Sequence, residues 1–276
     1  MEPRLSKSEQ KQAEKRSAVR AAVVHEAIQM EGEEELLRPV SALAWSGLAA
    51  GLSMGFSLVT EGLLRSSLPE APWTPLISKF GYSIGFLIVI LGRQQLFTEN
   101  TLTPILPLLA RRNLSTLSRV ARLWLVVLAA NLVGSNIFAW VISHTRLFSP
   151  NILAAFSSIG IEATTGDFWT ILVRAVFAGW LIALMVWLLP GAETARVSII
   201  TIITYIVGLG GFCHIVAGSV EAFFVANTGA ASWGQMVFGY LAPTLIGNVI
   251  GGVALVAALT HAQVAADATA EQEEGK

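Results

Sequence analysis

Charged residues are scarce in this chain, which has 276 residues, of which 54% are hydrophobic and 13% are charged. Soluble domains carry about 25% charged residues. Most of the charge lies near the two ends, so residues 39–262 hold only 17 charged side chains in 224 positions. A surface with so little charge excludes a soluble globular enzyme. The net charge of −1, without a basic stripe, excludes a protein that binds nucleic acid.

Cysteine is also scarce, and no secretion signal is evident. The single cysteine, Cys213, excludes a disulfide framework and a cysteine-based zinc site, and we expect no cofactor. The N-terminal segment is charged and lacks the apolar stretch of a signal peptide, so we expect no cleavage there.

Long uncharged runs, by contrast, are abundant. A helix needs about 20 mostly apolar residues to cross a bilayer, and four runs without charge reach or approach that length: 41–60, 123–143, 175–192 and 236–260. A fifth run, 197–220, lacks Asp, Glu, Lys and Arg but contains Gly-Leu-Gly-Gly and His214. A sixth is split, because residues 80–92 and 101–110 are apolar and 93–100 are polar. The sequence therefore predicts an all-α membrane protein with six transmembrane helices.

The basic residues between these spans predict the orientation of the chain. The segment after the second span holds four arginines, whereas the segments after the first and third hold one or two basic residues. Because basic loops stay in the cytoplasm, we expect both termini there. The predicted organisation is a cytoplasmic segment, 1–38, with a short amphipathic helix at 17–30, then a six-span domain, 39–262, and a disordered cytoplasmic tail, 263–276.

The two halves of the predicted domain repeat a pattern. Asn131-Leu-Val-Gly in the third span corresponds to Asn248-Val-Ile-Gly in the sixth, 117 residues later, and the same offset places Phe97 on His214. Three spans per half make this an inverted repeat of three plus three, with spans 2 and 5 interrupted. Interrupted helices leave backbone groups unpaired, which membranes tolerate only inside protein or along a watery cavity. We expect Asn131 and Asn248 to hydrogen-bond these groups, and the two breaks to mark a permeation or binding site.

These motifs resemble the formate/nitrite transporter family. The resemblance covers about residues 40–260 and rests on LFT at 96–98, GF-x-H ending at His214, and PTLIGNVIGG at 243–252. Three segments are most similar to the YfdC-like branch, an inner-membrane group within that family: 93–101, 214–221 and 45–55.

The resemblance implies an aquaporin-like protomer that assembles as a homopentamer in the lipid bilayer of a bacterial inner membrane, with one pore per protomer. It also implies a channel or transporter, not an enzyme, for small monovalent anions or their conjugate weak acids, such as formate, nitrite, acetate or hydrosulfide. The residues at matching positions of the pathway are Leu96, Phe97 and Thr98 in the loop of span 2, Tyr82 and Phe86 at a constriction, and His214 at the centre.

Two positions depart from the family's pattern. A lysine usually precedes the fourth span and draws anions into the vestibule, but Asp167 stands at that position. Arg174, seven residues later, is the candidate that would supply the missing positive charge. The asparagine that usually partners the central histidine is replaced by Ala183.

His214 is the only histidine well inside a predicted span, where ionisable groups are costly and usually line a pathway. With Thr98 it could hydrogen-bond an anion or pass it a proton. Glu221, seven residues after His214, lies on nearly the same helical face. It could act as a proton relay, as a charge at the pore mouth or as the partner of a neighbouring protomer. Arg93 and Glu99 flank the loop of the second span, and we expect them to pair with each other.

Three other functions stay open from the sequence alone. An aquaporin-like pore for small neutral solutes is one, although the chain lacks an Asn-Pro-Ala sequence. A non-conducting membrane accessory protein is another, because the vestibule residues are changed. An enzyme inside the membrane is the third, and it would need more nucleophiles or metal ligands than one histidine and one glutamate provide.

Overall fold

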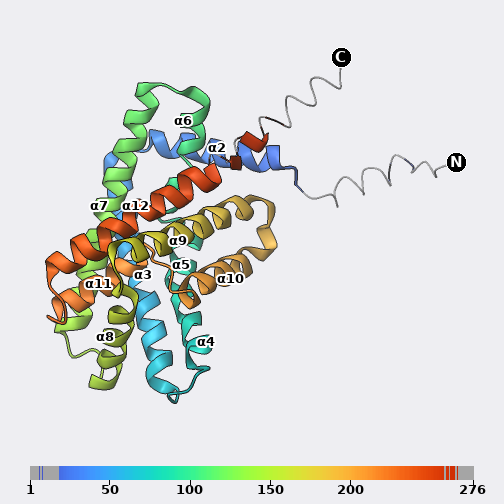
Figure 1. The fold of residues 1–276 in the computed structure, drawn as a ribbon. Coiled ribbons are helices and arrows are strands. Elements are labelled where there is room, and N and C mark those ends of the chain that lie inside the picture. The colour runs from blue at the N-terminus through green and yellow to red at the C-terminus, as the bar shows by residue number, and fades with distance from the viewer. Residues whose placement is uncertain are drawn as a thin grey trace.

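Helices form every regular element in the part of the chain that the computed structural model describes, namely residues 6, 8, 19–257, 259–260, 262–264 and 266 (Figure 1). The α-helices are α2 (Ala21–Leu37), α3 (Val40–Ser67), α4 (Thr74–Ser78), α5 (Tyr82–Leu91), α6 (Ile105–Arg111), α7 (Leu114–His144), α8 (Pro150–Thr164), α9 (Phe168–Leu188), α10 (Arg196–Leu209), α11 (Ala217–Asn227) and α12 (Ala242–Val249). Tighter turns form η1 (Lys79–Gly81), η2 (Glu99–Thr101), η3 (Leu189–Gly191) and η4 (Glu193–Ala195), and wider helical turns form η5 (Gln235–Leu241) and η6 (Ile250–Ala257).

Five helical stretches in the described residues are long and apolar enough to cross a membrane: Val40–Ser67, Thr74–Leu91, Leu114–His144, Phe168–Gly191 and Gln235–Ala254. They correspond to five of the six predicted spans. The remaining predicted span, 197–220, contains α10 except for its first residue, the start of α11 and a non-helical segment between them, and neither helix reaches 18 residues.

Short polar side chains and proline define where several helices begin. Asn113 precedes α7 and accepts a hydrogen bond from the backbone N–H of Thr116, at 2.8 Å. Asp167 precedes α9 and accepts hydrogen bonds from the backbone N–H groups of Trp169 and Thr170, both at 2.9 Å. Such caps pair donors that have no partner within the first turn of a helix.

Two helix pairs pack closely in the same manner, α3 with α7 and α9 with α12 and η6. Glycines permit both approaches, because a Cβ added at Gly134 would lie 2.5 Å from the carbonyl oxygen of Leu48, and one added at Gly251 would collide with that of Val176. Small residues at helix crossings are typical of membrane proteins. The two pairs therefore form equivalent frameworks on which the remaining segments are held.

Helix α11 is buried along almost its whole length, in contact with α3, α7, α8 and η5. Figure 1 places α2 and α6 at one end of the molecule and α4 and α8 at the other. Helix α2 begins and ends later than the predicted 17–30 helix, and it packs on α6, α7 and α9 through Val24, Ile28 and Leu36. Most of the predicted disordered tail lies outside the described residues.

Candidate functional site

A hydrogen bond between His214 and Thr98 joins two non-helical segments, one after α5 at residues 92–98 and one between α10 and α11 at residues 210–216. The distance between Nε2 of His214 and Oγ1 of Thr98 is 2.7 Å, and both side chains are fully buried. The other ring nitrogen, Nδ1, accepts hydrogen bonds from the backbone N–H groups of Val216 and Ala217, at 3.3 and 3.1 Å. Because Nδ1 is an acceptor, the neutral ring carries its proton on Nε2 and donates it to Thr98. The hydroxyl proton of Thr98 is then available to another acceptor.

Aromatic rings cover one side of this pair. Phe86 of α5 meets the ring of His214 edge to face, with 4.9 Å between the ring centroids. Tyr82 lies one turn earlier on α5 and is 5.4 Å from Phe86. Leu96 and Phe97 are also buried, and Phe97 packs edge to face against Trp124 of α7. Of the residues predicted for the pathway, the structure thus brings Thr98 and Phe86 directly to His214.

Asn131 and Asn248 hold the two non-helical segments through equivalent hydrogen bonds. Asn131 accepts from the backbone N–H of Phe97 at 2.9 Å and donates to the carbonyl oxygens of Gln95 and Gly47 at 2.9 and 2.7 Å. Asn248 makes the same three contacts in the other half of the chain, accepting from Ile215 at 2.8 Å and donating to Cys213 and Ala175 at 2.9 and 2.8 Å.

These contacts correct the register predicted for the two loops. The offset of 117 residues holds for Asn131 and Asn248. The backbone N–H group that binds the asparagine belongs, however, to Phe97 in the first half and to Ile215 in the second, so Phe97 is equivalent to Ile215 rather than to His214. Phe97 precedes Asn131 by 34 residues, whereas Ile215 precedes Asn248 by 33 residues. One additional residue therefore lies between loop and asparagine in the first half, and the residue equivalent to His214 is Leu96.

The helix ends that lead into the two loops follow the same corrected register. After α5, Gly92 is followed by Arg93 in the left-handed conformation, with φ of 51°, and after α10, Gly210 is followed by Gly211, with φ of 61°. In both cases the next backbone N–H bonds back five residues, from Gln94 to Val89 and from Phe212 to Val207, each at 3.0 Å. This arrangement terminates a helix while pairing its last carbonyl groups.

A pocket opens on each side of the His214–Thr98 pair. The first, which we call the Lys79 pocket, has a volume of about 160 Å³. The chemically distinctive residues of its lining are Lys79, Tyr82, Glu162, Cys213, Glu221 and Tyr240. The second, the Arg93 pocket, has a volume of about 310 Å³ and is lined mainly by polar residues. They include Glu31, Glu35, Arg93, Gln95, Glu99 and Arg196. Helix α5 runs from Tyr82 in the lining of the first pocket to Ile90 in the lining of the second, and Phe86 between them contacts His214. The buried pair therefore lies between the two pockets.

The predicted charged residues have different partners from those expected. Asp167 is fully exposed at the start of α9, where hydrogen bonds from Thr170 lower the pKa of its carboxyl group. Arg174 donates to the backbone carbonyl of Thr165 at 3.1 Å and does not line the Lys79 pocket. The prediction that Arg93 pairs with Glu99 is wrong, because Arg93 forms an ion pair with Glu31 of α2 at 3.1 Å.

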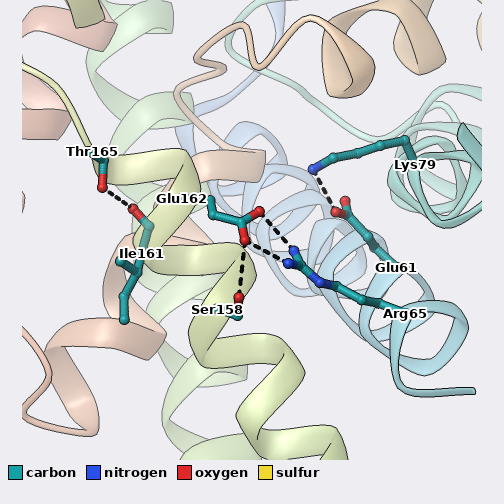
Figure 2. A network of polar contacts seen from close by, with 7 residues as sticks. All are labelled: Glu61, Arg65, Lys79, Ser158, Ile161, Glu162 and Thr165. Atoms are coloured by element: carbon teal, nitrogen blue, oxygen red, sulfur yellow. Dashed lines mark hydrogen bonds and ion pairs between the residues drawn. The ribbon is translucent and has the colours of Figure 1, made fainter. Parts of the chain in front are cut away.

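A network of charged residues beside the Lys79 pocket was not predicted from the sequence (Figure 2). Lys79 forms an ion pair of 2.6 Å with Glu61, whose side chain is only 1% exposed. One turn further along α3, Arg65 binds Glu162 of α8 through two hydrogen bonds, of 2.8 and 2.6 Å. These bonds lower the pKa of Glu162. Partners 97 residues apart leave no local pattern, so only the spacing of Glu61 and Arg65 on one helix face was visible in the sequence.

The described residues contain no group of three or more His, Cys, Asp or Glu side chains that could hold a metal ion. The buried polar groups of the site are instead a histidine, a threonine hydroxyl, the backbone of two loops and an adjacent network of ion pairs. Such an arrangement can donate hydrogen bonds to a small polar solute.

Comparisons with known proteins identify relatives along most of the chain. Residues 22–262 match the model of the formate/nitrite transporter family. The chain is 40% identical to the inner membrane protein YfdC of Escherichia coli K12 over 254 residues, which cover 92% of this chain and 82% of YfdC. A solved pentameric formate channel with formate bound has a similar fold, with a TM-score of 0.64 and 21% identity over 83% of this chain and 95% of that one. An FNT family ion channel matches with a TM-score of 0.66 and 18% identity over 86% and 94% of the two chains.

Proposed function

Since the chain belongs to the formate/nitrite transporter family, we propose that it carries small monovalent anions or their conjugate weak acids across the inner membrane of a bacterium. Members of this family are channels and transporters, so the chain is not an enzyme. The observation that carries the proposal is the buried His214–Thr98 pair between two pockets, since a bare anion needs hydrogen-bond donors wherever the membrane excludes water.

We propose that α10 and α11 together form the fifth span, interrupted at residues 210–216 as the second span is at 92–98. The equivalent hydrogen bonds of Asn131 and Asn248 support this interpretation, as do the equivalent helix ends at Arg93 and Gly211. Both halves then contain a continuous span, an interrupted span and a span that carries the asparagine. Three spans per half give an inverted repeat with an aquaporin-like arrangement.

The proposed pathway runs from the Lys79 pocket past Tyr82 and Phe86 to Thr98 and His214, and from there to the Arg93 pocket. Leu96 and Phe97 build the loop that presents Thr98. The neutral ring of His214 donates to Thr98, whose hydroxyl proton is directed to an oxygen of the substrate. Glu221, in the lining of the Lys79 pocket, is the candidate for moving protons to and from the solvent on that side.

The proposed assembly is a homopentamer with one pathway per protomer and both termini in the cytoplasm. Large apolar side chains on the outside of the membrane-length helices, such as Leu125 and Trp140 of α7, agree with lipid or neighbouring protomers around each chain. In this orientation α2 and the Arg93 pocket face the cytoplasm and the Lys79 pocket faces outward. Arg174 and Asp167, near the start of α9, stay candidates for the approach of the anion.

Flux measurements in proteoliposomes test the proposal. Formate, nitrite, acetate and hydrosulfide should be taken up at rates that depend strongly on pH. The neutral solutes glycerol and urea should not be taken up. The variant H214N should keep the assembly and change the pH dependence, because an amide donates a hydrogen bond but does not titrate. The variant H214L copies the equivalent residue Leu96 and should largely close the pathway. Wild-type uptake by H214L at every pH would mean that His214 only packs, and uptake of neutral solutes alone would identify a neutral pore.

A further inference from the structure

The ion pair between Glu61 and Lys79 has an unusual asymmetry. The side chain of Glu61 is 1% exposed, whereas that of Lys79 is 20% exposed and lines the pocket. Within the described residues, Oε2 of Glu61 receives no hydrogen bond, and its charge is compensated mainly by Lys79, through Oε1 at 2.6 Å. Lys79, in contrast, has N–H groups free to meet a solute in the pocket, since an ammonium group carries three donors.

Among the charged groups around Glu61, Lys79 is the cation that more than one carboxylate can pair with. Around Glu61 lie Arg65 on the same helix, Lys79 of η1, Glu162 of α8, Tyr82 of α5 and Glu221 of α11. Arg65 and Glu162 are joined by two hydrogen bonds and so satisfy each other (Figure 2). Lys79 therefore faces two carboxylates, Glu61 in the protein interior and Glu221 in the pocket lining.

We propose that Lys79 is an anion-binding residue of the outward pocket and that Glu61 is its internal competitor, so that an anion and a proton bind there together. This inference rests on the proposed transport of monovalent anions. When an anion takes hydrogen bonds from Nζ of Lys79, Glu61 loses its counter-charge. A buried carboxylate without a partner is strongly unfavourable, so a proton supplied by the buffered solvent in the pocket adds to a carboxylate oxygen of Glu61. When the anion leaves, the proton returns to water and the ion pair forms again.

The proposal makes opposite predictions for the two members of the pair. The variant E61Q removes the internal competitor of Lys79, so the KM for formate should fall and should depend less on pH. The variant K79Q removes the anion-binding group, so the KM should rise at every pH. We expect each change to be about tenfold, within the range of couplings between linked binding sites. A pair that only stabilises the fold predicts the same direction of change for both variants.

The matched control is E33Q, which breaks an ion pair outside both pockets. Glu33 of α2 pairs with Arg111 of α6 at 2.7 Å, its side chain is 38% exposed, and it lines neither the Lys79 pocket nor the Arg93 pocket. E33Q should therefore keep the wild-type KM and its pH dependence. The variants are compared as intact pentamers in proteoliposomes, after their melting temperatures have been measured.

A second measurement needs only the wild-type protein. Calorimetric titration with formate in buffers of different ionisation heat counts the protons taken up, and one proton per bound formate is expected at neutral pH. Transport of formate without proton uptake on binding, or KM values that move together in E61Q and K79Q, would overturn this inference and leave the proposed function intact. Failure of the wild type to move any weak acid would overturn both.

Discussion

Replacing Asn131 with alanine should destabilise the protein strongly without touching the transported solute. The side chain is fully buried and pairs three backbone groups, the N–H of Phe97 and the carbonyl oxygens of Gln95 and Gly47. Alanine leaves these groups without their partner. A buried polar group that loses its partner costs about 1–3 kcal/mol, so three such groups predict a loss of at least about 3 kcal/mol. The same calculation holds for N248A, since Asn248 makes the equivalent contacts.

The control for this prediction lies on the same helix. Asn136 of α7 is half-buried and accepts one long hydrogen bond, of 3.4 Å, from Asn227. N136A should therefore lose less than about 1 kcal/mol, the value of one ordinary hydrogen bond. Melting of the detergent-solubilised pentamer measures all three variants, and formate flux per folded pentamer measures whether the loop still presents Thr98.

Two results would refute the reasoning. If N131A melts like N136A, the three backbone groups find other partners and the asparagine does not hold the loop. If N131A and N248A differ by several kcal/mol, the two halves are not energetically equivalent. The expected result is a similar, large loss of stability in both, with reduced flux in the fraction that stays assembled.

Three further predictions concern single side chains. T98V should abolish most weak-acid flux, and T98S should retain it, because the hydroxyl group both accepts from His214 and donates onward; a conducting T98V would contradict this role. G134V should prevent the close approach of α3 and α7 and lower the melting temperature, whereas G239V, where an added Cβ meets nothing within 4 Å, should not. Burial raises the pKa of Glu35, so its contribution to stability is present at acidic pH and is lost as the pH rises through that raised pKa. The wild type should therefore fall in melting temperature relative to E35Q between acidic and neutral pH, and parallel curves would show that Glu35 does not titrate.

The sequence predicted the membrane-length helices and the residues that hold the two loops because both follow from local chemistry. Uncharged runs of about 20 residues have few other structures open to them. The repeated Asn-x-x-Gly sequence at Asn131 and Asn248 identified side chains able to pair an interrupted backbone. The register of the loops was missed by one residue, since the intervening segments differ in length and the motif alone does not reveal where the extra residue lies.

The charged network could not be predicted, because its geometry depends on how distant helices meet. Glu61 and Lys79 are separated by a turn and a short helix, and the partner of Arg65 lies in α8, outside the predicted spans. The pairing expected for Arg93 failed for a related reason. Helix α2 brings Glu31 to that side chain from a distant part of the sequence.

The corrected register separates the residues that build the fold from those that we assign to the pathway. The framework residues occur in both halves: Asn131 with Asn248, and Gly134 with Gly251. The pathway residues do not, because the equivalents of His214 and Thr98 are Leu96 and Val216.

The same asymmetry extends to the charged pair. At the offset that relates α5 to α10, the equivalent of Lys79 is Val197, and at the offset that relates Gly47 to Ala175, the equivalent of Glu61 is Leu189. Backbone pairing and close helix packing are needed on both sides of the pathway, so those residues are repeated. In the proposed pathway, a single donor pair at the centre and a single cation at one mouth assist passage, and placing each in one half only would give the two mouths different chemistry.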